Sequence, residues 1–227
     1  MADSTPNPEL LRSLGRLVRG LSCLFWGLPI ALLISVPGVP SQWLVHVGWG
    51  PRVLATGLLL FGVWQLGSFQ RQERIWVSTH GRAQAVALVN VGLSPFLFWC
   101  ERAPQLAYFQ LGALMFHLGL LLFLALLNSV LERLTSMLPD ETLRTETRLF
   151  AGVNRWLVLL LLAAASLFHA GINWTRVADQ YPRLLEFVGE YPSYFIMPFV
   201  LIAIALTMAV IWKTKQVILD SVFGGQH

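Results

Sequence analysis

The sequence predicts an all-α integral membrane protein, a polytopic bundle of six transmembrane helices with both ends of the chain in the cytosol. Three observations predict it. Of the 227 residues, 56% are hydrophobic and only 12% are charged, against about 25% charged in soluble domains. The charged residues divide the chain into six uncharged windows, and the basic residues gather in alternate connections between those windows. We therefore expect one membrane domain.

Each uncharged window can hold one spanning helix. The clearest window lies between Arg102 and Glu132. About 20 apolar residues rising 1.5 Å each cross the roughly 30 Å hydrocarbon core. The second and third windows are near the ~17-residue lower limit for a span. The six windows are residues 20–51, 53–70, 83–100, 103–131, 156–175 and 191–212.

The basic residues predict the orientation. With the N-terminus inside, twelve basic residues lie on the inner side and four on the outer side, and the positive-inside rule favours this arrangement. The protein is thus expected in a cell membrane, the inner membrane if the source is bacterial, with both termini cytoplasmic. The inner residues are Arg12, Arg16, Arg19, Arg71, Arg74, Arg82, Arg133, Arg144, Arg148, Arg155, Lys213 and Lys215.

The two ends of the chain are expected to flank the membrane domain, which covers residues 20–212. Residues 1–19 are predicted to form a cytosolic or interfacial amphipathic segment, because Leu10, Leu14 and Leu17 recur at helical spacing among arginines. Residues 213–227 are predicted to form a cytosolic helical extension of the last span.

Spans four, five and six are predicted to extend past the inner membrane surface. No proline lies between Pro104 and Pro139, so span four continues into water, and Asp140 can begin the next helix. Spans four and five then form a helical hairpin whose tip covers about residues 131–155. The apolar residues that we expect to bind a partner on this cytosolic projection are Leu131, Leu134, Leu138, Leu143, Phe150 and Ile218.

Polar residues inside the spans form a second candidate site, because they are costly in hydrocarbon. A turn of about 100° per residue places Gln110, His117 and Asn128 on one stripe of span four. Two interpretations remain open: interhelical hydrogen bonds that fix the packing, or a polar path for a solute. A proline at position 95 also frees a backbone carbonyl that a hydroxyl or a neighbouring helix must satisfy. The predicted cluster consists of Gln65, Asn90, Ser94, Gln110, His117 and Asn128.

No enzyme motif occurs in the sequence, so no catalytic residue, metal site or cofactor is predicted. His117 and His169 lie at different depths, which disfavours haem ligation by both. The basic residues are dispersed among connections, which argues against nucleic acid binding. The leading hypothesis is a non-catalytic membrane subunit or scaffold that oligomerises or binds a membrane-complex partner through its cytosolic projection. The alternative is a small-solute transporter or channel with a path along Gln65, Asn90, Gln110 and His117.

Overall fold

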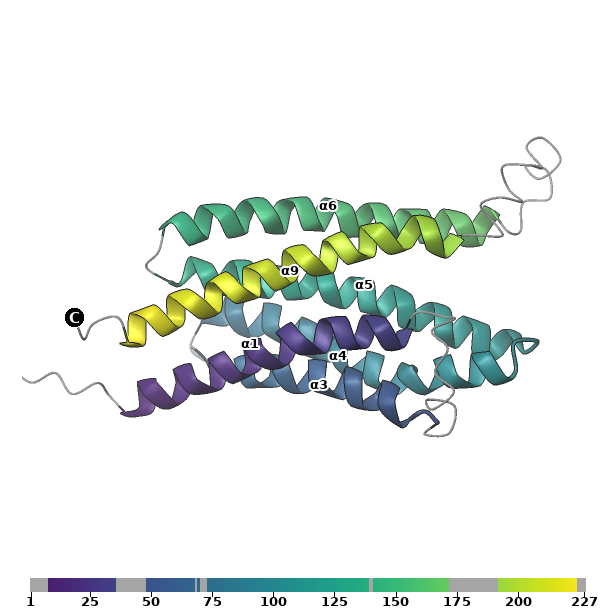
Figure 1. Cartoon of the computed structure of the whole chain (residues 1–227), viewed down its shortest axis with the longest axis horizontal. Helices are drawn as coiled ribbons and strands as arrows, with labels where there is room; N and C mark the ends of the chain where they lie inside the picture. Colours follow the sequence, from purple (N-terminus) through teal and green to yellow (C-terminus); the bar gives the residue numbers. More distant parts are fainter. Residues whose placement is uncertain are drawn as a thin grey trace, which may run out of the picture.

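The computed structural model describes residues 8–35, 48–67, 69, 73–138, 141–171 and 192–223. Within these residues every regular element is a helix, and the helices run side by side along one axis (Figure 1). The all-α prediction is therefore confirmed. The helices are α1 (Pro8–Ser35), α3 (Gly50–Leu66), α4 (Arg74–Arg102), α5 (Ala107–Ser136), α6 (Glu141–Gly171) and α9 (Pro192–Phe223).

Five of these helices, α1, α4, α5, α6 and α9, are long and apolar enough to cross a membrane. The sixth, α3, has 17 residues, or about 26 Å at 1.5 Å per residue, which is the lower limit for a span. Large apolar side chains also cover the outside of the bundle, as lipid contact requires. The chain is thus consistent with a multi-pass membrane protein.

The helices close into a ring. Each described helix packs against the next one along the chain, α9 packs back against α1, and α5 also contacts α9. The rings of Phe25 and Trp212 lie 5.8 Å apart where α1 meets α9. A single cluster of buried apolar side chains contains residues of all six helices. The interior of the ring is therefore a packed core.

The start of α1 and the end of α9 lie at the same end of the bundle (Figure 1, left). We name this the terminal end. The turn between α5 and α6 also lies there, whereas the turn between α4 and α5 lies at the opposite end (Figure 1). The structure thus places both described ends of the chain together.

Two helices depart from the predicted boundaries. Helix α1 continues without a break through residue 19, and Leu17 and Leu21 are fully buried, so this segment packs as part of the bundle. Helix α4 begins at Arg74, so the expectation that Arg74 and Arg82 lie in a connection between two windows is wrong. His80 is buried beside α3 and shares a hydrogen bond of 2.8 Å with the carbonyl of Val63. The charged residue Arg82 does not mark the start of α4, because it lies on the exposed face of that helix.

The prediction for Pro95 is confirmed. Helix α4 continues through this proline, which has no N–H to bond the carbonyl four residues earlier, that of Val91. The hydroxyl of Ser94 donates a hydrogen bond of 2.9 Å to that carbonyl instead. The buried Ser94 therefore satisfies the backbone group that the proline leaves free.

Glycines allow α1 and α3 to approach each other closely. A Cβ atom at Gly20 would lie 2.8 Å from the carbonyl oxygen of Gly62 and 2.9 Å from the Cβ of Gln65. Small residues at helix contacts are typical of membrane bundles, in which close packing replaces the hydrophobic effect as the driving force. Gly15, on the same helix, has no atom within 4 Å of the corresponding position.

We predict that Gly20→Ala lowers the free energy of unfolding by about 1–3 kcal/mol, because the added methyl group would overlap backbone that cannot move cheaply. The matched control is Gly15→Ala, which gains helix propensity in open space and is expected to be neutral or stabilising by up to about 1 kcal/mol. Unfolding in detergent by titration with dodecyl sulfate, followed by circular dichroism, measures both. Equal effects of the two substitutions would contradict the close α1–α3 contact.

Candidate functional site

Three helices meet at one buried hydroxyl group, that of Thr207 in α9. Its Oγ1 accepts hydrogen bonds from Nδ2 of Asn128 in α5, at 3.0 Å, and from Nδ2 of Asn154 in α6, at 2.9 Å. The same hydroxyl donates to the carbonyl of Ala203 at 2.8 Å. A hydroxyl has one donor and two acceptor positions, so all of them are used. We name Asn128, Asn154 and Thr207 the polar node.

The two asparagines of the node also bond backbone carbonyls. Nδ2 of Asn128 donates to Leu124 at 2.7 Å, within its own helix, and Nδ2 of Asn154 donates to Ala203 of α9 at 3.1 Å. Both amide nitrogens are therefore occupied by protein atoms, whereas Oδ1 of Asn154 is buried without a hydrogen-bond partner among the described residues. This arrangement corresponds to the interpretation of intramembrane polar residues as packing contacts.

Only one residue of the node, Asn128, was among the predicted site residues. Asn154 was missed because it precedes Arg155, and the uncharged window begins only at residue 156. Thr207 was missed because threonine hydroxyls are common in spans. A signal for Asn154 does exist. It recurs with the buried Ala151, Val158 and Leu161 at helical spacing, and a polar residue on an apolar face predicts a partner.

The other predicted polar residues lie at separate contacts. Gln65 of α3 faces α1, since its Cβ lies beside Gly20. Asn90 of α4 is buried with its side chain against Gly119 of α5. Ser94 is also buried and bonds its own helix. Gln65 thus belongs to the contact of α3 with α1, and Asn90 belongs to the contact of α4 with α5.

Gln110 and His117 are exposed on α5. Nε2 of Gln110 donates to the carbonyl of Pro104 at 2.5 Å, and Nδ1 of His117 lies 2.7 Å from the carbonyl of Ala113. The stripe that they share with Asn128 is covered by α9 at Asn128, and it is exposed where Gln110 and His117 lie. The structure therefore does not bring the polar residues of span four to one site.

The residues predicted to bind a partner on the projection lie mostly inside the bundle. Leu131, Leu134, Leu138 and Ile218 are buried, and Phe150 is partly buried against the same apolar cluster. The side chain of Leu143 lies outside the described residues. The buried side chains hold the terminal end together and are not available to a partner, so any partner must contact other residues.

Polar contacts join the helices at the terminal end. Arg155 of α6 pairs with Glu132 of α5 at 2.9 Å, and Lys213 of α9 pairs with Glu146 of α6. Exposed ion pairs of this kind contribute about 0–1 kcal/mol each, so the buried leucines supply most of the stability. The ion pairs join α6 to α5 and to α9 at this end.

Arg144 closes the end of α5. Its guanidinium donates to the carbonyl of Ser136 at 3.0 Å, where the last turn of the helix leaves carbonyls without partners. A cation is also favourable at the negative end of a helix macrodipole. Arg144 therefore ties α6 to α5 across the turn.

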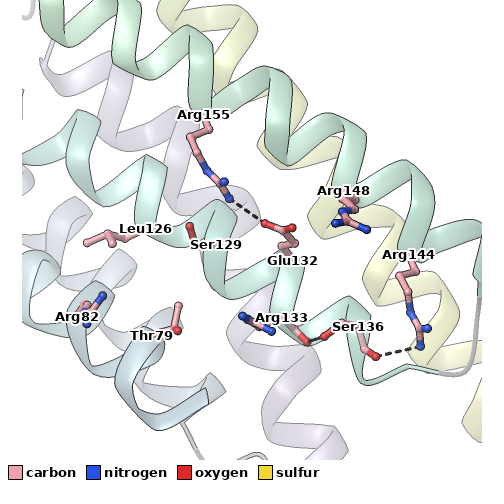
Figure 2. A pocket seen from close by; sticks show the side chains of 10 residues that line it. All are labelled: Thr79, Arg82, Leu126, Ser129, Glu132, Arg133, Ser136, Arg144, Arg148 and Arg155. Carbon is pink, nitrogen blue, oxygen red and sulfur yellow. Dashed lines mark hydrogen bonds and ion pairs between the residues drawn. The ribbon is translucent and has the colours of Figure 1, made fainter. Parts of the chain in front are cut away.

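A polar cleft of about 560 Å³ opens at this end over α5, between α4 and α6. Figure 2 shows its side chains, with Arg82 from α4, Arg133 from α5 and three arginines from α6. The sequence does not reveal that these arginines share one cleft, because they lie on three different helices. The cleft is lined by Thr79, Arg82, Leu126, Ser129, Glu132, Arg133, Ser136, Arg144, Arg148 and Arg155.

No family model matches the chain, and neither a curated protein nor a solved structure matches it. Among the residues that the structure describes, no group of three or more histidine, cysteine, aspartate or glutamate side chains could hold a metal ion.

We predict that Thr207→Val lowers the free energy of unfolding by about 0.6–1.7 kcal/mol, the usual range for interhelical hydrogen bonds in membranes. The matched control is Thr56→Val. Thr56 is equally buried, but its hydroxyl bonds only carbonyls of its own helix, those of Arg52 and Val53. Titration with dodecyl sulfate measures both variants. A control variant that loses as much stability as Thr207→Val would show that the node adds nothing.

Proposed function

We propose that the protein is a non-catalytic integral membrane subunit that assembles with a second copy of itself, chiefly through an exposed apolar strip on α6. The strip consists of Leu149, Val153, Trp156 and Leu160, which are 66%, 52%, 76% and 58% exposed. We further propose that α3 is a sixth span and that the terminal end lies in the cytosol.

The distribution of basic residues supports the cytosolic placement. Arg12, Arg133 and Lys215 are examples of the many basic residues toward the terminal end, whereas Arg52 and Arg102 lie near the opposite end. Short connections rich in arginine and lysine stay on the cytoplasmic side during insertion. An even number of spans also agrees with the common location of the two described chain ends (Figure 1).

The position of the strip is the observation that carries the oligomer proposal. Trp156 follows Arg155, and tryptophan and arginine residues together are typical of the headgroup level of a membrane. Val153 and Leu149 lie about one and two turns further toward the terminal end. Acyl chains do not reach that level, so these two exposed apolar side chains need protein to cover them.

The spacing of the strip favours a second copy as that protein. Its residues are separated by four, three and four positions, which is the spacing of a coiled-coil seam. A twofold axis along the membrane normal would place α6 of each copy parallel and set identical residues opposite each other. β-Branched Val153 alternating with Leu149 also favours a two-stranded contact.

The rival hypothesis of a solute path stays a prediction that no described contact supports. Its four residues would have to line one continuous route, but Gln110 and His117 are exposed on the outside of α5. The interior of the ring is occupied by apolar side chains from every helix.

We predict that Val153→Cys, in a chain with Cys23 and Cys100 replaced by serine, is joined to a second copy by a membrane-permeant bis-maleimide. Ile75→Cys is the matched control, because Ile75 has a similar exposure at the start of α4. In intact cells an impermeant maleimide should label Gln105→Cys, in the turn between α4 and α5, and should not label Val153→Cys. Denaturing gels measure both reactions.

Four results would contradict these proposals. Equal crosslinking of the control would show random collisions, and a monomer at all protein densities would rule out the second copy. Labelling of Val153→Cys from outside would reverse the orientation. Crosslinking of Val153→Cys to a different protein would replace the second copy by another partner.

A further inference from the structure

We infer that the cleft between α4, α5 and α6 binds the headgroup of an acidic phospholipid, with the phosphodiester oxygens held by arginine side chains. This inference goes beyond the proposed assembly and does not depend on it. On α6, Arg144, Arg148 and Arg155 share one face, whereas the apolar strip lies roughly 130° away around the helix. The cleft and the strip therefore use different surfaces.

The charge of the cleft favours an anion. Five arginines and one glutamate line it, and that glutamate, Glu132, is paired with Arg155. Arg82, Arg133 and Arg148 are exposed and form no ion pair with any acidic residue that the structure describes. Like charges around one concave surface repel one another and raise the local concentration of anions.

Arginine also has the right geometry for a phosphate group. Its planar guanidinium presents five N–H donors and bonds two phosphate oxygens at once. The hydroxyls of the cleft are less free to donate, because Thr79, Ser129 and Ser136 each donate to a carbonyl of their own helix. The arginines are therefore the principal donors in the cleft (Figure 2).

The surface beyond the cleft is apolar, which favours a lipid over a soluble phosphate compound. On α5, Ser129, Arg133 and Ser136 lie at the polar end of one stripe that continues toward the membrane centre with exposed apolar residues. Steps of about 100° keep this stripe within a sector of about 60°. The exposed apolar residues of the stripe are Leu111, Met115 and Leu122.

On the neighbouring helices, too, an arginine of the cleft is followed by an exposed apolar residue toward the membrane centre. Arg82 of α4 is followed two turns later by the exposed Val89, and Arg155 of α6 is followed one turn later by the exposed Leu159. An arginine-rich cleft below an apolar surface matches a phosphate headgroup below its acyl chains. Basic pockets between transmembrane helices on the cytoplasmic side are suited to such headgroups. A cleft of about 560 Å³ also lies within the usual range for small-molecule sites, about 300–1,000 Å³.

The test measures the binding of phosphatidylglycerol to the full-length protein in dodecyl maltoside, by the shift of the unfolding temperature during lipid titration. The variant is Arg133→Gln with Arg148→Gln, and the matched control is Arg12→Gln with Arg16→Gln. The control removes the same charge from exposed positions of α1 toward the terminal end. Parallel titrations use phosphatidylcholine and inorganic phosphate. Arg82→Gln is the second variant if the double variant does not fold.

We expect the cleft variant to bind phosphatidylglycerol about 30-fold more weakly than the unsubstituted chain, and Arg82→Gln about fivefold more weakly. The control variant should bind within about twofold of the unsubstituted chain, because α1 does not line the cleft. Phosphatidylcholine and inorganic phosphate should bind much more weakly than phosphatidylglycerol.

Two results would overturn the inference. Equal losses in the cleft and control variants, or no loss in either, would mean that the arginines of the cleft do not hold the lipid. Inorganic phosphate that stabilises the protein as well as phosphatidylglycerol does would assign the cleft to a soluble phosphate compound. The crosslinking of Val153→Cys is expected to be unchanged in every arginine variant, so failure of this site would not be confused with failure of the assembly.

Discussion

The hydroxyl of Thr207 fixes how the second half of the bundle is arranged. In hydrocarbon the apolar faces of α5, α6 and α9 could slide past one another with little change in free energy, since lipid tails are as apolar as leucine. Hydrogen bonds from Asn128 and Asn154 to one hydroxyl remove that freedom. The position of α9 then allows Trp212 to meet Phe25 of α1, which closes the ring.

The three faces of α6 show what this arrangement makes possible. One face carries Asn154 and packs inside the bundle, and a second carries Arg148 and borders the cleft. The third face carries Val153 and points away from the other helices. If α6 were rotated by one residue, about 100°, each of these faces would be replaced by another. The polar node therefore determines which side chains the cleft and the apolar strip present.

Much of the fold could be predicted from the sequence, because its signals are local. Uncharged windows marked the helices, and Pro95 predicted the hydroxyl bond that Ser94 makes. The extended start of α4 was missed because Arg82 is charged yet lies on the exposed face of a helix, where charge is tolerated. A count of charges along the chain does not distinguish an exposed helical face from a loop.

The candidate sites were harder to predict, because they depend on which helices become neighbours. Gln110, His117 and Asn128 do lie on one stripe of α5, as the helical rotation of about 100° per residue predicts. The rotation does not reveal that α9 covers this stripe only at Asn128. Similarly, Arg82 and Arg148 are distant in sequence and line one cleft only because α4 and α6 both pack against α5. Pairing of this kind requires the tertiary structure.

The central claim is that the polar node holds α6 and α9 together, and a double-mutant cycle between Asn154→Ala and Thr207→Val tests it most directly. The free energy of unfolding in dodecyl sulfate is measured for the unsubstituted chain, both single variants and the double variant. Residues that share a hydrogen bond lose less stability together than the sum of their separate losses. We expect a coupling free energy of about 0.6–1.7 kcal/mol. Additive losses, with a coupling near zero, would contradict the claim.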